Sequence, residues 1–345
     1  MGFDAGTRNK AGALYERALA IKPNFALARN DYGYWLNDQK RFDEAIAQFE
    51  VALARDPAQS DLNTNLLAYY GRLGDFDKAR AQVDRWLAIS PENPGPHAFR
   101  ASLQEASGNL AEGLKFRRKV LAMAPHDPRA SPDVHFGELG LGEFQTVLKA
   151  DEPYLRYRAM VLMGRKDDAR ALVRQETDAR PDFPQQQSDY LDVHNSIHDW
   201  AEVARYYDEA WGSPESFQQA CIWPPYTYVL PALLDAGHRD APAMLAAARR
   251  AIDADRASGF RNANYDMNEA GIYFLEGHPG KATDLLELAY SKGKRDIYLF
   301  IYPSLNDAPR PRLEALEAKV AADINAERAM LGWPAIEMPK AYRAD

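Results

Sequence analysis

Two histidines with metal-binding spacing are the first candidates for chemistry in this chain. His194 and His198 are four residues apart in a stretch expected to be helical, and Asp192 and Asp199 lie beside them. Two histidines on one face of a helix form a known zinc-binding geometry. A catalytic zinc site would also need a glutamate nearby, but residues 195–197 read Asn-Ser-Ile. Two interpretations stay open: a role in helix packing, which we favour, and a metalloenzyme built on helical repeats.

The other catalytic motifs are absent or stand in an unsuitable context. The sequence has no GxSxG motif and no P-loop, and the glycine-rich run GELGLGE (137–143) does not follow an expected strand. The single Cys221 excludes an internal disulfide framework and a cysteine-based zinc site. We therefore predict a protein that is not an enzyme, with no catalytic residues, no bound metal and no cofactor.

Composition narrows the class of protein further. The 345 residues are 46% hydrophobic and 27% charged, which is typical of a globular protein. The formal net charge of −8 argues against nonspecific binding to nucleic acid, which depends on lysine and arginine contacts to phosphate. No apolar run approaches membrane-spanning length, and the start MGFDAGTRNK lacks the apolar core of a secretory signal. We expect a cytoplasmic protein that contacts neither membrane nor nucleic acid.

Four prolines reveal an internal repeat. Pro23, Pro57, Pro91 and Pro125 end four similar phrases (ALAIKP, ALARDP, WLAISP and VLAMAP) and are each separated by 34 residues. This period predicts units of two helices joined by a turn, with the proline ending the second helix.

Small side chains recur at fixed positions inside these units. In the unit that begins at Ala26, Gly33, Ala45 and Ala52 occupy positions 8, 20 and 27. Gly108 and Gly113 occupy positions 15 and 20 of a later unit. We expect such residues where two helices cross, because a larger side chain would push the helix axes apart.

Residues 11–128 closely resemble the tetratricopeptide repeat (TPR) family in period, in the small-residue pattern and in the terminal proline. The resemblance implies an all-α, right-handed α-solenoid of about eight helix pairs that acts as a scaffold for protein interactions. We divide the chain into a regular array (1–128), an irregular insertion (129–149), degenerate helix pairs (150–293) and an irregular segment with a capping helix (294–345). We expect a hinge or loop at HFGELGLGEF (135–144) and a final helix over about 312–332 with an apolar stripe.

The first repeat is incomplete. Residues 11–22 match only the second helix of a unit, so most of its first helix is missing. One hypothesis is that the chain is the C-terminal part of a longer architecture, or that its start site has been placed too far downstream. The alternative is that the first helix frays or packs differently.

The resemblance also implies a concave groove lined by the first helix of each unit. Five candidate peptide-binding residues follow, and we call them the five groove residues: Asn30, Tyr34, Asn37, Asn65 and Arg72. Side-chain amides can bind the backbone of a protein or peptide partner without demanding a sequence. The alternative is that these are ordinary solvated side chains. The Lys/Asn/Arg clamp by which some TPR proteins bind a C-terminal carboxylate is not present, since only Asn65 fits it.

A narrower resemblance covers residues 260–335. This part is similar to the ends of TPR arrays in bacterial regulators that carry a winged-helix DNA-binding domain or an adenylate-cyclase domain. The matching residues are Pro303, Leu305, Pro309, Arg310, Leu313 and Leu316, while Pro311 replaces an expected phenylalanine. It implies an alternative function, as the sensory or regulatory portion of such a regulator, whose catalytic or DNA-binding domain lies outside this chain. A related helical repeat that reads RNA would need a basic groove, which the acidic composition disfavours.

Overall fold

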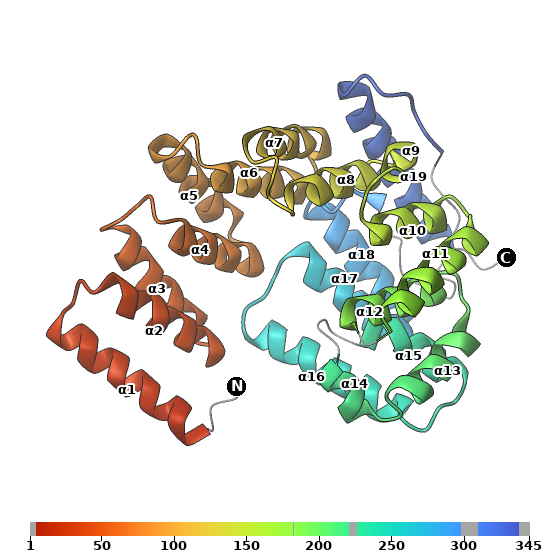
Figure 1. Ribbon diagram of the computed structural model, residues 1–345, viewed down its shortest axis with the longest axis horizontal. Coiled ribbons are helices and arrows are strands. Elements are labelled where there is room, and N and C mark those ends of the chain that lie inside the picture. Colours follow the sequence, from red (N-terminus) through yellow and green to blue (C-terminus); the bar gives the residue numbers. More distant parts are fainter. Residues whose placement is uncertain (1–4, 182, 221–225, 298–309, 338–345) are drawn as a thin grey trace. The chain divides into compact units, whose positions relative to one another are not determined.

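The chain folds into helical hairpins, as the repeat predicts. The computed structural model describes residues 5–181, 183–220, 226–297 and 310–337 (Figure 1). All secondary structure in these ranges is helical, which confirms an α-solenoid of helix pairs. The first unit of the chain comprises Met1–Leu103 and Asp255–Asn262, and the second unit comprises Gln104–Ala254 and Ala263–Asp345. Among the described helices, none combines the length and apolar character needed to cross a bilayer.

The first unit contains the regular repeats. Each proline of the repeat lies a few residues after a second helix, where it prevents the helix from continuing. The helices are α1 (Ala5–Ile21), α2 (Ala26–Asp38), α3 (Phe42–Leu53), α4 (Ser60–Leu73), α5 (Phe76–Ile89) and α6 (Pro94–Ala106), the last of which ends in the second unit.

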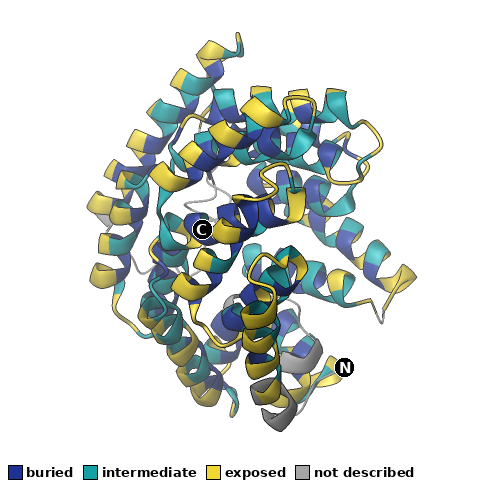
Figure 2. Ribbon diagram, turned by 90° about the vertical axis from the view of Figure 1, so that its left-hand side faces the viewer, coloured by how far each residue is buried: buried dark blue, intermediate teal, exposed yellow. Residues whose placement is uncertain are grey.

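The second unit continues the same hairpin pattern with less regular helices. Its helices are α7 (Leu110–Met123), α8 (Ala130–Gly140), α9 (Phe144–Val147), α10 (Pro153–Leu162), α11 (Lys166–Ala179), α12 (Pro184–Ser196), α13 (Trp200–Ala210), α14 (Pro214–Ala220), α15 (Tyr226–Asp235), α16 (Ala241–Ala257), α17 (Ala263–Leu275), α18 (Pro279–Ser291) and α19 (Arg310–Met330). The helices bury the faces that meet other helices and expose the opposite ones (Figure 2).

Small residues lie where the helices of a pair cross. Gly33 is buried in α2, and a Cβ atom there would lie 2.5 Å from Cε1 of Phe49 in α3. Ala45 and Phe49 are both fully buried. The absence of a side chain at Gly33 therefore lets α3 approach α2 closely enough to bury the Phe49 ring.

Helix α1 packs on α2 along one side only. A Cβ atom on Gly12 would lie 2.5 Å from the Trp35 ring, and the rings of Tyr15 and Tyr32 are 5.8 Å apart. On other sides of α1, the side chain of Leu14 is 60% exposed.

The expected hinge at 135–144 is wrong for most of its length. Residues 130–140 form α8, and Leu139 and Leu141 are fully buried. A Cβ atom on Gly137 would lie 3.3 Å from Cδ1 of Leu114 in α7, so this glycine serves close helix packing rather than flexibility. Only Gly142, with a φ of 74°, marks a turn before α9.

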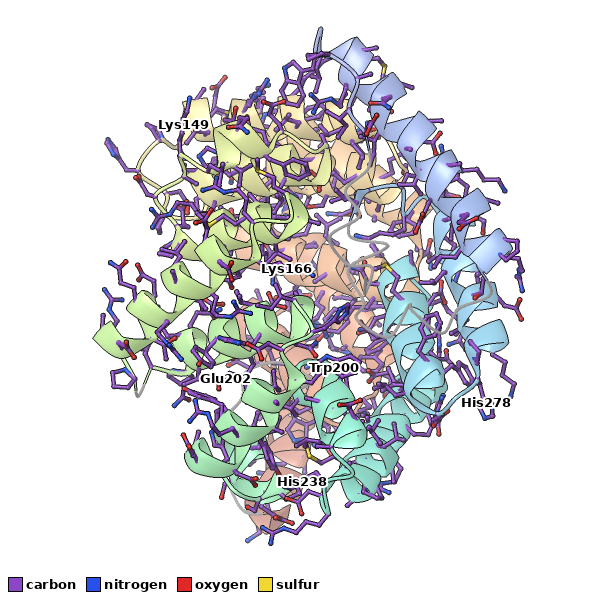
Figure 3. The ribbon with its side chains drawn as sticks, turned by 90° about the vertical axis from the view of Figure 1, so that its right-hand side faces the viewer. Lys149, Lys166, Trp200, Glu202, His238 and His278 are labelled. Atoms are coloured by element: carbon purple, nitrogen blue, oxygen red, sulfur yellow. The ribbon has the colours of Figure 1, made fainter. Side chains whose placement is uncertain are left out.

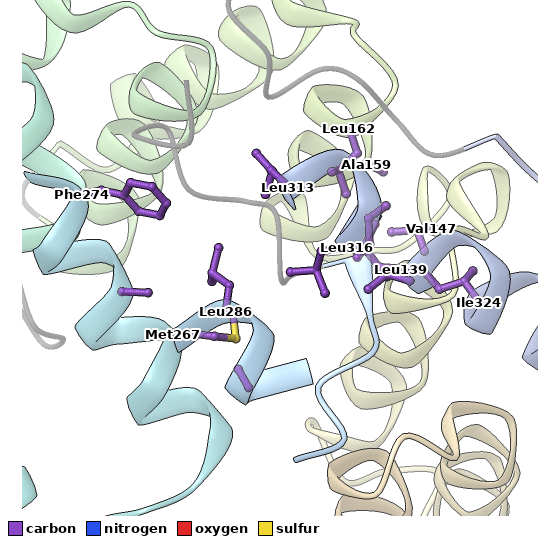
Figure 4. Close-up of a cluster of buried hydrophobic side chains, with 14 of the residues drawn as sticks. Leu139, Val147, Ala159, Leu162, Met267, Phe274, Leu286, Leu313, Leu316 and Ile324 are labelled. Carbon is purple, nitrogen blue, oxygen red and sulfur yellow. The ribbon is translucent and has the colours of Figure 1, made fainter. Parts of the chain in front are cut away.

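The final helix has the predicted apolar stripe. Leu313, Leu316, Val320 and Ile324 are at most 2% exposed, whereas Met330 is 56% exposed. Figure 4 shows the stripe in a cluster with side chains of α8–α10, α17 and α18. Burial of each such aliphatic side chain contributes about 1.5–3 kcal/mol. The matching residues Pro303, Leu305 and Pro309 of the narrower resemblance lie outside the described residues.

A buried arginine fixes the end of α19. The Arg328 side chain is 2% exposed, and it donates hydrogen bonds to the carbonyl oxygens of Leu141 at 2.9 Å and Pro334 at 2.7 Å. It also donates to the Glu143 carboxylate at 3.2 Å. A buried guanidinium is tolerated only when its donors and charge are satisfied, as they are here.

Two glycine substitutions test the packing argument. Gly33→Ala is expected to lower the free energy of unfolding by about 1–3 kcal/mol, because its methyl group would overlap the buried Phe49 ring. Gly71→Ala, also within a helix, meets no atom within 4 Å and should raise stability by up to about 1 kcal/mol. Urea denaturation measures both, and equal stability of the two variants would contradict the close-crossing explanation.

Candidate peptide-binding groove

Two of the five groove residues form a direct contact. Tyr34 lies on α2 and Asn65 on α4, the first helices of successive repeats. The Asn65 side-chain amide donates a hydrogen bond of 2.6 Å to the Tyr34 hydroxyl. The Tyr34 ring also packs edge-on against Phe49 at 6.0 Å, although the side chain remains 44% exposed. The phenol is thus held in place while part of it faces solvent.

The other two asparagines are not joined to this pair. Asn30 is half-buried, and its Oδ1 atom is shielded from solvent with no hydrogen-bond donor beside it. Asn37 donates to its neighbour Asp38 at 3.5 Å. A shielded carbonyl oxygen without a donor is unfavourable, so a donor supplied by a ligand would stabilise the Asn30 side chain.

Arg72 marks the end of the groove residues on α4. Its guanidinium lies over the Tyr69 ring, 5.8 Å from the centroid. Burial raises the pKa of Tyr69 to about 12, so the ring stays neutral below that pH. The stacking orients the arginine but leaves its side chain exposed.

A later part of the chain, residues 255–262, contacts this same end, and we call it the docked segment. The backbone nitrogen of Arg261 donates to the Arg72 carbonyl at 3.1 Å, and the Asn262 amide donates to the Gly71 carbonyl at 3.0 Å. Both carbonyls belong to the last turn of α4, where the Gly71 carbonyl also accepts from the backbone nitrogen of Gly74 at 3.2 Å and the Arg72 carbonyl lies beyond the regular helical hydrogen bonds. The docked segment therefore binds mainly through backbone groups of α4.

Apolar packing reinforces the docked segment. Phe260 is 6% exposed, and its ring centroid lies 5.0 Å from that of Phe42 at the start of α3. Burial raises the pKa of Asp255, an effect opposed by the positive charges of Lys40 and Arg72. Sequence reasoning missed this contact, since a single phenylalanine between polar residues carries no repeat signal.

The structure does not bear out the two-histidine geometry. His194 is 1% exposed in α12, but His198 lies beyond the end of that helix with a φ of 59°. His198 occupies position 15 of its repeat, where Gly74, Gly108 and Gly164 adopt the same left-handed conformation. The two rings therefore do not share a helical face. Within the described residues, no group of three or more His, Cys, Asp or Glu side chains could hold a metal ion.

His194 instead belongs to a packed polar cluster of the second unit. Its Nδ1 lies 3.0 Å from the Asp199 carboxylate, and its ring lies tilted against that of Tyr190, with the two ring centroids 4.3 Å apart. The Tyr190 hydroxyl donates to Glu202 of α13, which is labelled in Figure 3. Hydrogen bonds from Arg205 and then from Tyr190 lower the pKa of Glu202 to about 2. The cluster joins α12 to α13, which is a structural role.

One known family matches part of the chain. Residues 36–103 match the tetratricopeptide repeat family. This segment runs from the end of α2 into α6 and includes Asn37, Asn65 and Arg72. The inactive TPR repeat-containing thioredoxin TTL3 of Arabidopsis thaliana is 31% identical over 81 residues. That match covers 24% of this chain and 12% of TTL3, so the chain spans only a small part of this relative.

Solved structures with similar folds have low sequence identity. A tetratricopeptide repeat protein from Parabacteroides merdae is 14% identical with a TM-score of 0.33, over 86% of this chain and 98% of that one. The human IFIT1 dimer with PPP-AAAA is 12% identical with a TM-score of 0.38, over 82% and 68%. The complex of Naa15/Naa10 bound to HypK-THB is 14% identical with a TM-score of 0.32, over 95% and 66%.

Acid should weaken the second unit through His194. Burial lowers the pKa of His194, while the hydrogen bond to Asp199 partly opposes this shift. Below about pH 6.5 the unfolded chain binds a proton that the folded chain binds less well, so stability falls as the pH drops through that value. His194→Asn should reduce the slope of unfolding free energy against pH between about pH 7 and pH 5.

The matched control is the exposed His126, whose replacement by asparagine should leave that slope as it is in the parent. Chemical denaturation at several pH values measures it. An unchanged slope in the His194 variant would show that this histidine is not held neutral by burial.

Proposed function

We propose that the first unit binds an extended segment of a protein partner along the groove residues of α2 and α4. One observation carries this proposal: the docked segment is held at the Arg72 end through backbone hydrogen bonds to α4. The docked segment consists of the last turn of α16 followed by a short non-helical stretch. A surface that binds it by main-chain contacts has the chemistry to bind the backbone of a partner. The tetratricopeptide match over 36–103 supports the same role, because this fold implies a protein-interaction scaffold.

The remaining groove residues offer complementary contacts. The docked segment covers the Arg72 end, so Asn30, Tyr34 and Asn65 are left for a partner. Asn65 offers an amide and Tyr34 a flat aromatic surface, whereas the shielded Oδ1 atom of Asn30 reaches a partner only if its side chain rotates outward. Such contacts recognise a backbone more than a sequence. Affinity would come from many weak contacts, and specificity from the few side chains that reach Tyr34.

Site-specific crosslinking tests where a partner binds. A photoreactive phenylalanine placed at Tyr34 should crosslink peptides selected from a random displayed library against the whole chain. The control is the same residue at Val51 of α3, which is 42% exposed compared with 44% for Tyr34. Crosslinking at position 34 and not at 51, located by mass spectrometry, is the expected result. Equal crosslinking at both positions would contradict the groove.

Charge substitutions test the contribution of the groove residues. Combined Asn30→Glu, Tyr34→Glu and Asn65→Glu changes should weaken the selected peptides by about tenfold or more, equivalent to about 1.4 kcal/mol. Val51→Glu adds an acidic residue elsewhere and should leave the affinity within about twofold of the parent. Circular dichroism checks that each variant stays folded. Undiminished binding by the triple variant would count against the proposal.

A further inference from the structure

A pocket opens between three consecutive helices of the second unit. It lies between α10, α11 and α12 and encloses about 360 Å³, including the part that is open to solvent. Its apolar walls include the rings of Tyr154 and Tyr157 and the side chain of Val173. Glu176 and Asp189 also line it. The pocket is distinct from the groove residues, all of which lie in the first unit.

The two carboxylates of the pocket lack a basic partner. Asp189 accepts a hydrogen bond of 2.8 Å from Gln185, which lies one turn earlier on α12. Within the described residues, neither Asp189 nor Glu176 forms an ion pair. The neighbouring Arg158 is instead paired with Asp192 at 3.1 Å. The pocket therefore holds negative charge that its own residues do not neutralise.

Neutral polar groups of the pocket add further acceptors. Tyr157 is 1% exposed, and no group in the described part of the chain donates to its hydroxyl oxygen. The Oε1 atom of Gln186 is likewise buried without a donor. The Thr177 hydroxyl donates to neither of these two oxygen atoms, because it donates to the Val173 carbonyl at 2.9 Å. Acceptors thus outnumber available donors, which is unfavourable unless a ligand brings donors of its own.

We propose that this pocket binds an alkylammonium group, with the charge at Asp189 and Glu176 and the methylene stem against the tyrosine rings and Val173. An ammonium group brings three donors and a positive charge, and aromatic faces attract cations. A carboxylate or phosphate would meet two negative charges and is disfavoured. The first turn of α12 carries a partial positive charge that opposes a cation, but two carboxylates act against this single helix end. This inference does not depend on the groove proposal.

The ionisation of Asp189 links this binding to pH. The pKa of Asp189 is raised to about 6, chiefly by burial and to a lesser extent by the charge of Asp192 on α12. Hydrogen bonds from Tyr157 of α10 and Gln185 of α12, and the charge of Arg158, act in the opposite direction. A bound ammonium would favour the ionised carboxylate. At about pH 5 only a tenth of the Asp189 side chains are ionised, so apparent affinity should fall about tenfold from its value near pH 7.5.

Isothermal titration calorimetry of the whole chain with small probes tests the site. N-acetyl-lysine methylamide should bind near pH 7.5, whereas the norleucine analogue, which lacks only the amino group, should bind at least about tenfold more weakly. 1,5-Diaminopentane has a similar methylene stem but no peptide groups. Comparing its affinity with that of the lysine probe shows whether the pocket prefers a free amine or a lysine side chain. Binding by either amine supports the alkylammonium site. Equal binding of the lysine and norleucine probes, or no binding by any amine, would overturn it.

Variants locate the binding to this pocket. Asp189→Asn combined with Glu176→Gln should abolish amine binding and its pH dependence. Asp178→Asn removes one exposed carboxylate on α11 outside the pocket, should change neither, and is the control for the loss of a negative charge from the same helix. Amine binding that survives the double substitution would place the site elsewhere and refute the proposal.

A measurement of thermal stability distinguishes loss of the binding site from unfolding of the variant. The raised pKa of Asp189 means that its ionisation destabilises the fold above about pH 6 and does not below about pH 4. Asp189→Asn should therefore raise the melting temperature near pH 8 and leave it unchanged near pH 4. A stable double variant that fails to bind the amine then reports on the pocket alone. A double variant that melts earlier than the parent near pH 8 would contradict the burial of Asp189 on which the proposal rests.

Discussion

The close approach of paired helices is the constraint on which both units depend. At Gly33 the α3 helix comes near enough for the Phe49 ring to occupy the space where a side chain would be. Phe49 in turn supports the Tyr34 ring, which accepts the hydrogen bond from Asn65. A missing side chain on the inside of the pair thus sets the position of an aromatic group on the outside. Helix packing therefore positions two of the five candidate groove residues, Tyr34 and Asn65.

The second unit is held together in a different way. Its largest apolar cluster includes Leu139 and Leu162 from early helices and Leu313 and Ile324 from the last one (Figure 4). Because α19 packs against helices that precede it by more than a hundred residues, it is an internal part of this core. Arg328 adds polar contacts at its end. The terminal helix therefore acts less as a cover for an open stack than the repeat architecture alone suggests.

The period of the repeat predicted the helices. The features that it did not predict lie at positions where one repeat has a different residue type from the others. The three- and four-residue spacing of apolar side chains was enough to predict the stripe of α19, and the 34-residue spacing was enough to place the hairpins of the first unit. It also contained the signal that excludes a helical pair of histidines, because His198 stands at a position where other repeats have left-handed glycines. Gly137 lies in the stretch 135–144 where a hinge or loop is expected, whereas its small size in fact allows α8 to pack closely against Leu114. The presence of a glycine in the sequence does not show whether it serves backbone flexibility or close helix packing.

Other features depend on contacts between residues that are distant in sequence. Tyr157 occupies position 8 of its unit, where Gly33 stands in an earlier repeat, and it brings a buried hydroxyl next to Asp189. The period gives the position of Tyr157 but not the charges that surround it. The repeat places Tyr34 and Asn65 on the first helices of successive units but does not predict their hydrogen bond, and it carries no signal for the contact of Phe260 with Phe42. The hairpins can be predicted from the local sequence pattern, whereas the candidate sites depend on tertiary packing.

The discontinuous makeup of the first unit has a consequence for synthesis on the ribosome. Its repeats end at Leu103, yet Phe260, which covers Phe42, is made more than 150 residues later. During that interval the emerging chain exposes the aromatic surface at Phe42 and the Arg72 carbonyl that Arg261 later pairs. The repeats of the first unit therefore leave the ribosome well before the segment that completes them, and chaperones can recognise them in that period.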